Sequence, residues 1–95
     1  CGAVKAACDG VELGHITGLL ASIQPAGDHT AKSTGKTPSS SDSEFVNATI
    51  ENNVRATMQR ILEKSSILDD LYQKGSIGLV GGVYQLDTGE VTWLD

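Results

Sequence analysis

Two cysteines and two histidines are the side chains of this sequence with the widest range of chemistry. Cys1 is followed directly by Gly2, Cys8 comes seven residues later, and His15 and His29 stand further along the chain. Thiolate and imidazole groups bind zinc, and a thiolate is also a nucleophile. The sequence has no Cys-x-x-Cys motif, which disfavours a thiol redox protein. Each of these residues therefore has to be judged by the element that positions it.

The residues after Cys1 predict a short helix, because residues 3–8 are mostly strong helix formers and Asp9 with Gly10 offers a stop. In such a helix the Cα atoms of Cys1 and Cys8 would lie roughly 10 Å apart, too far for a disulfide. The helix dipole would stabilise a thiolate at Cys1, the form that binds zinc. We expect Cys8 to be a small packed side chain. A substitute zinc site of Cys1, Cys8 and His15 is a less favoured alternative.

Further helices are predicted by apolar residues that recur every three or four positions. One helix is expected over residues 11–24, and a long one starts near Ser41, which has capping-box spacing to Glu44. A short helix after Ser65 is expected to end at Gly75. Residues 27–43 are rich in Gly, Ser, Thr and Lys and lack an apolar period, so they predict a mobile surface loop.

The last part of the chain changes to a strand pattern. Residues 77–86 are apolar at both alternating sets of positions, which predicts a central strand covered on both faces. Residues 87–89 (DTG) predict a tight turn into an antiparallel strand over residues 91–94. One such hairpin cannot form a stable sheet alone, so further strands are expected from upstream sequence or a second chain. Because Met58 is the only methionine, we expect that sequence to precede Cys1.

Length and charge narrow the classes of protein. The length of 95 residues predicts one domain, residues 1–95. We expect this domain to be partial, because the other strands of its sheet are missing. A net charge of −5 without a basic stripe argues against a nucleic-acid partner. The sequence has no apolar run of the ~18 residues that span a bilayer, so no membrane partner is expected. Two unpaired thiols favour a reducing compartment, the cytoplasm, with an organelle as the alternative.

Four segments together resemble the C-terminal half of the β-class carbonic anhydrases in order and spacing. They are residues 1–7 (CGAVKAA), 53–55 (NVR), 65–68 (SSIL) and 80–91 (VGGVYQLDTGEV). The resemblance implies an α/β fold, the C-terminal part of a β-carbonic-anhydrase-like fold, with helices on a mostly parallel sheet and an antiparallel terminal strand. It implies a homodimer or higher homo-oligomer.

The resemblance also implies a zinc-dependent lyase that interconverts carbon dioxide and bicarbonate by zinc-bound hydroxide. Cys1 would be one of its zinc ligands, and Gly2 would bring the backbone close to the substrate. The family's Cys-x-Asp-x-Arg motif and its ligand histidine do not occur in these 95 residues, so no catalytic residue is assigned here. Two alternatives stay open: a non-catalytic oligomerisation module derived from the family, and a member acting on a related small molecule such as carbonyl sulfide.

Overall fold

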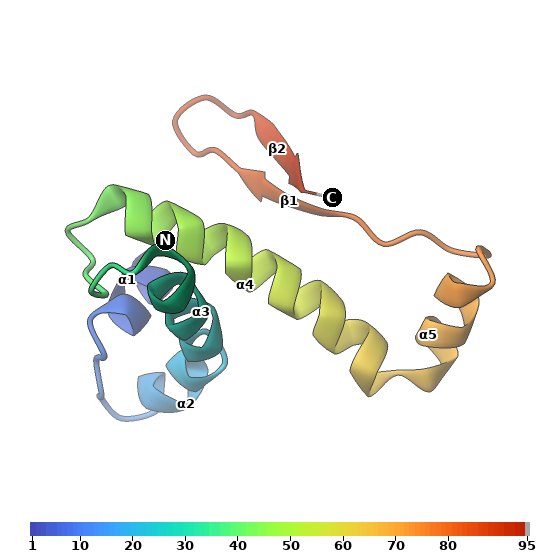
Figure 1. Ribbon diagram of the computed structural model, residues 1–95, viewed down its shortest axis with the longest axis horizontal. Coiled ribbons are helices and arrows are strands. Elements are labelled where there is room, and N and C mark those ends of the chain that lie inside the picture. The colour runs from blue at the N-terminus through green and yellow to red at the C-terminus, as the bar shows by residue number, and fades with distance from the viewer. Residues whose placement is uncertain (95) are drawn as a thin grey trace. The chain divides into compact units, whose positions relative to one another are not determined.

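The computed structural model describes residues 1–94, which form five helices and a two-stranded antiparallel sheet (Figure 1). This composition confirms the α/β class, while the mostly parallel sheet is not found within residues 1–94. The chain divides into two compact units, residues 1–53 and the residues from 54 onward. In chain order the elements are α1 (Gly2–Cys8), α2 (Ile16–Ala21), α3 (Gln24–Thr34), α4 (Ser43–Lys64), α5 (Ser66–Gln73), β1 (Gly81–Tyr84) and β2 (Val91–Leu94).

The first unit has a hydrophobic core to which α1, α2 and the start of α4 contribute. Phe45 of α4 is its largest fully buried side chain, and α1 presents one apolar face to it. Such a core stabilises the unit by removing apolar area from water. Its buried members are Val4, Ala7, Cys8, Leu20, Ile23, Phe45 and Val46.

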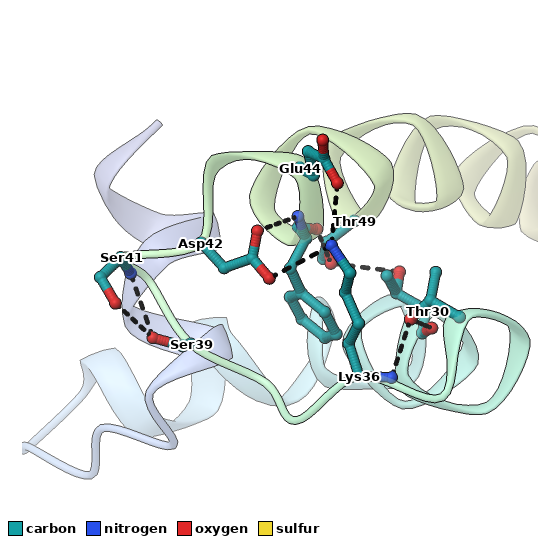
Figure 2. A network of polar contacts seen from close by, with 9 residues as sticks. Thr30, Lys36, Ser39, Ser41, Asp42, Glu44 and Thr49 are labelled. Atoms are coloured by element: carbon teal, nitrogen blue, oxygen red, sulfur yellow. Dashed lines mark hydrogen bonds and ion pairs between the residues drawn. The ribbon is translucent and has the colours of Figure 1, made fainter.

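Buried hydroxyl groups join α3 to α4. Thr30 and Thr49 are both fully buried, and their Oγ1 atoms lie 3.1 Å apart (Figure 2). The Thr30 hydroxyl donates to the carbonyl of Ala26 (2.9 Å) and accepts from the side-chain amide of Asn52 (2.9 Å). The Thr49 hydroxyl also lies 2.8 Å from the carbonyl of Phe45. Because these buried polar groups all have partners, their hydrogen bonds offset the cost of removing them from water and link the two helices.

The loop predicted over residues 27–43 is wrong for its first half, because α3 continues to Thr34. Pro25 lies at the first turn of the helix, where its fixed φ is favourable, and Thr30 gives the helix a buried face. A sequence rich in Thr, Ser and Lys does not reveal that face. Gly35, with a φ of +70°, ends the helix, so only residues 35–42 are irregular. The helix predicted over residues 11–24 is likewise shorter, as α2 begins at Ile16.

The segment 35–42 is fixed at both of its ends. Lys36 Nζ lies 2.8 Å from the Glu44 carboxylate and 3.6 Å from that of Asp42 (Figure 2). The N–H of Phe45 donates to Asp42 Oδ1 (3.3 Å), so Asp42 caps α4 in place of the predicted Ser41. Ser41 instead pairs with Ser39, their hydroxyl oxygens being 2.7 Å apart.

The helix α5 begins and ends as its sequence predicts. The Ser65 hydroxyl accepts a hydrogen bond from the N–H of Leu68 (3.2 Å). At the other end Gly75 has a φ of +76°, and the N–H groups of Gly75 and Ser76 donate to the carbonyls of Tyr72 and Leu71. These two bonds form a Schellman motif, which satisfies the last carbonyls of the helix.

The hairpin of β1 and β2 confirms the predicted turn and the antiparallel pairing. Gly89 has a φ of +73°, and its N–H donates to the carbonyl of Gln85 (2.8 Å). The strand predicted over residues 77–86 is wrong in length and in burial: β1 covers Gly81–Tyr84, and Val80 and Leu86 are 74% and 86% exposed. The reason is that the described residues contain no further strand or helix that covers these side chains.

Within the second unit, α4 covers one face of the hairpin. A Cβ atom placed on Gly81 would lie 2.6 Å from both Val54 Cγ1 and Met58 Sδ, too close for any real side chain. The absence of a side chain at Gly81 therefore lets two side chains of α4 lie close against the strand.

Candidate functional site

Cys1 lies at the start of α1 with its side chain exposed. The N–H of Lys5 donates to the Cys1 carbonyl (3.1 Å), which forms the first turn of the helix. Val4, Ala7 and Cys8 of the same helix are buried in the core. This packing fixes the position of α1, while the thiol of Cys1 at its start remains exposed.

A hollow of about 460 Å³ lies beside Cys1 in the first unit. Cys1 and Lys5 stand four residues apart on α1 and therefore share one face of it. The hollow combines a thiol, an amine, hydroxyls and an amide with two aliphatic side chains. Its lining residues are Cys1, Lys5, Ser40, Ser41, Ser43, Val46, Asn47 and Ile50.

Two serines that line this hollow, Ser40 and Ser41, belong to the segment 35–42, which is hydrogen-bonded to the end of α1. The N–H of Ser40 donates to Asp9 Oδ1 (2.9 Å). Hydrogen bonding from Ser40 lowers the pKa of the Asp9 carboxyl, so this acceptor stays ionised. The ion pair with Glu44 raises the pKa of Lys36 in turn. The four-residue spacing from Cys1 could have indicated that Lys5 lies beside it in the hollow. No feature of the sequence indicated that Ser40, Ser41 or Asn47 would line the same hollow.

The other candidate donors lie apart from Cys1. Cys8 is buried, with its Sγ 4.0 Å from Thr49 Oγ1, which confirms its packing role. His15 and His29 are exposed, at the start of α2 and on α3. Within residues 1–94 no three His, Cys, Asp or Glu side chains are grouped closely enough to hold a metal ion. The substitute zinc site of Cys1, Cys8 and His15 is therefore wrong.

Gly2 has no packing reason to be a glycine in the part of the chain that the structure describes. A Cβ atom at this position would meet no other atom within 4 Å among residues 1–94. The donor set next to it is equally incomplete, since one soft thiolate suits zinc but four ligands are usual. The described residues thus provide one zinc donor and do not form a zinc site by themselves.

The two thiols are expected to react with alkylating reagents at very different rates. Cys1 is exposed, whereas burial raises the pKa of the Cys8 thiol, with a smaller opposing effect of its bond to Thr49. The reactive thiolate of Cys8 is thus scarcer at any given pH, and reagents cannot reach it. Near neutral pH iodoacetamide should label Cys1 alone, and Cys8 should follow only on unfolding. Peptide mass mapping measures this, and equal labelling of both thiols would contradict the fold of the first unit.

Comparison with known families assigns the chain. A family model described as carbonic anhydrase matches residues 1–91, nearly the whole sequence. The chain therefore belongs to the carbonic anhydrase family, which confirms the resemblance to its β class. Searches of curated proteins and of solved structures gave no match. Of the helices within residues 1–94, none has both the length and the apolar character needed to cross a bilayer.

Proposed function

We propose that this chain is the C-terminal part of a zinc-dependent carbonic anhydrase that hydrates carbon dioxide reversibly to bicarbonate. Cys1 is one of its zinc ligands, and Gly2 lies beside the substrate. The observation that carries this proposal is the exposed thiol at the start of α1, which lies beside a polar hollow in a chain of the carbonic anhydrase family. The buried Cys8 is excluded as the ligand because it packs in the core.

The remaining zinc donors are proposed to come from outside residues 1–95. Neither a Cys-x-Asp-x-Arg motif nor a histidine three residues before a cysteine occurs in this sequence. The same argument applies to the sheet, because a two-stranded hairpin is only marginally stable in water. Further strands next to β1 would give the mostly parallel sheet that the family resemblance implies.

Measuring zinc content and carbon dioxide hydration on the same samples tests this function. The native protein, with every chain or segment that accompanies these residues, should contain about one zinc per copy and be active. The 95-residue chain alone should bind zinc weakly and show no hydration above background, since it has a single donor. Native protein free of zinc and without activity would overturn the proposal.

A second candidate function is a non-catalytic assembly module derived from the family. Its support is that the described residues bring together no group of side chains able to hold a metal ion. Such a module would associate without zinc and would be unaffected by a chelator. If the native protein instead contains zinc but hydrates carbon dioxide poorly, a related substrate such as carbonyl sulfide is the one to assay.

A further inference from the structure

The hollow beside Cys1 is lined by a single charged side chain, that of Lys5. Its other lining side chains are a thiol, three hydroxyls, an amide and two aliphatic groups, and none of them is a carboxylate. No carboxylate of residues 1–94 forms an ion pair with Lys5 either. The ammonium group of Lys5 is therefore a positive charge without a counter-charge, on the wall of a polar hollow.

The acidic side chains that are near this hollow in sequence have other partners. The carboxylates of Glu44 and Asp42 lie 2.8 Å and 3.6 Å from Lys36 Nζ (Figure 2). The Asp9 carboxylate accepts the hydrogen bond from the N–H of Ser40. A small anion that enters the hollow thus meets the charge of Lys5 and no carboxylate among the lining residues.

Hydrogen-bond donors surround the same space. Hydroxyl and amide groups of four lining residues can donate to an anion, and these residues are Ser40, Ser41, Ser43 and Asn47. Ser43 is the first residue of the 22-residue helix α4, so the positive end of that helix dipole also lies at the hollow. The volume of about 460 Å³ admits an anion of four heavy atoms with several waters, since one water takes roughly 30 Å³.

We propose that this hollow receives the bicarbonate anion and that Lys5 is the residue that binds it. The choice of bicarbonate rests on the proposed function, because Cys1, the proposed zinc ligand, lines the same hollow. Bicarbonate has a negative charge and three oxygen atoms that accept hydrogen bonds, whereas carbon dioxide is uncharged. Lys5 therefore acts on the bicarbonate side of the reaction and leaves the binding of carbon dioxide unaffected.

Kinetics of the native protein in both directions test this assignment. Lys5→Gln should raise the KM for bicarbonate by about fivefold, with the KM for carbon dioxide and the zinc content unchanged. Because the overall equilibrium is fixed, kcat/KM should fall by the same factor in both directions, and the kcat of dehydration should change little. Lys5→Arg keeps the positive charge and should keep most of the affinity for bicarbonate.

Lys32 provides the matched control in the same unit. It is exposed on α3 and does not line the hollow, and Lys32→Gln changes the net charge by the same amount as Lys5→Gln. Lys32→Gln should leave the KM for bicarbonate unchanged. The effect of Lys5→Gln should shrink as the salt concentration rises, because mobile ions screen the attraction between exposed charges.

Chemical labelling of the native protein gives a second measurement that does not depend on activity. Bicarbonate at roughly 0.1 M should slow the acetylation of Lys5 by an amine-reactive ester about twofold or more, relative to chloride at the same ionic strength. Acetylation of Lys32 should be equally fast in both salts. Peptide mass mapping measures the two sites in one sample.

The results separate this assignment from the proposed function. In an active protein, an unchanged KM for bicarbonate in Lys5→Gln would overturn the role of Lys5, as would an equal effect of Lys32→Gln. The proposed function would stand in both cases. If the native protein lacks zinc and activity, the proposed function falls and labelling decides on the hollow: selective protection of Lys5 would support bicarbonate binding there, and equal labelling in both salts would overturn it.

Discussion

Replacing Cys1 by serine is expected to remove zinc from the native protein and to abolish carbon dioxide hydration. The thiol is exposed at the start of a helix that other residues, Val4, Ala7 and Cys8, anchor in the core, so its loss should affect the site and not the fold. A serine hydroxyl does not replace a thiolate as a zinc ligand. Mutating a residue that only hydrogen-bonds to a metal ligand lowers metal affinity by roughly 10- to 100-fold, so losing the ligand itself should lower it further. Metal analysis and a hydration assay measure both effects.

The matched control is Cys8→Ala, which removes the other thiol of the same helix. Because Cys8 packs in the core beside Thr49, its removal should lower the free energy of unfolding by about 1–2 kcal/mol. Zinc content and activity should stay near those of the unsubstituted protein. If Cys1→Ser retained its zinc, or if Cys8→Ala lost it, Cys1 would not be the ligand.

The elements that the sequence predicts well are those whose ends are decided locally. Ser65 caps α5 and Gly75 closes it because hydrogen bonds with neighbouring residues determine both ends. The turn at Gly89 is local in the same way. The helix α3 was missed because it depends on a tertiary contact: Thr30 is buried by pairing with Thr49, nineteen residues away. Composition alone assigns such a segment to a loop.

The central strand shows the opposite error. Residues 77–86 have the apolar pattern of a strand that is covered twice, yet β1 has four residues and α4 covers one of its faces. An apolar pattern on both faces of a strand indicates that both faces need to be covered. Among residues 1–94, α4 covers one face of β1 and nothing covers the other. Val80 and Leu86 are exposed for this reason. The same holds at Cys1, where the residue type indicates a metal but a single donor is present.

Replacing Phe45 by alanine is expected to be the most destabilising single change in the first unit. Phe45 is fully buried at the start of α4, among core residues of α1 and α2. Removing a buried Phe side chain costs about 3–5 kcal/mol, through lost burial and the cavity that remains. A small domain is stable by about 5–15 kcal/mol, so the variant should be close to unfolded. Denaturant unfolding followed by circular dichroism measures this, whereas the fluorescence of Trp93 reports on the second unit.

The control for this change is Leu19→Ala, an exposed apolar residue of the same unit. It should change the free energy of unfolding by no more than about 0.5 kcal/mol, because surface substitutions away from special features have small effects. A loss below about 1 kcal/mol for Phe45→Ala would show that α4 does not depend on this side chain for its contact with the core. The position of Cys1 would then lose its physical basis, since the helix that presents Cys1 is fixed by packing in that core.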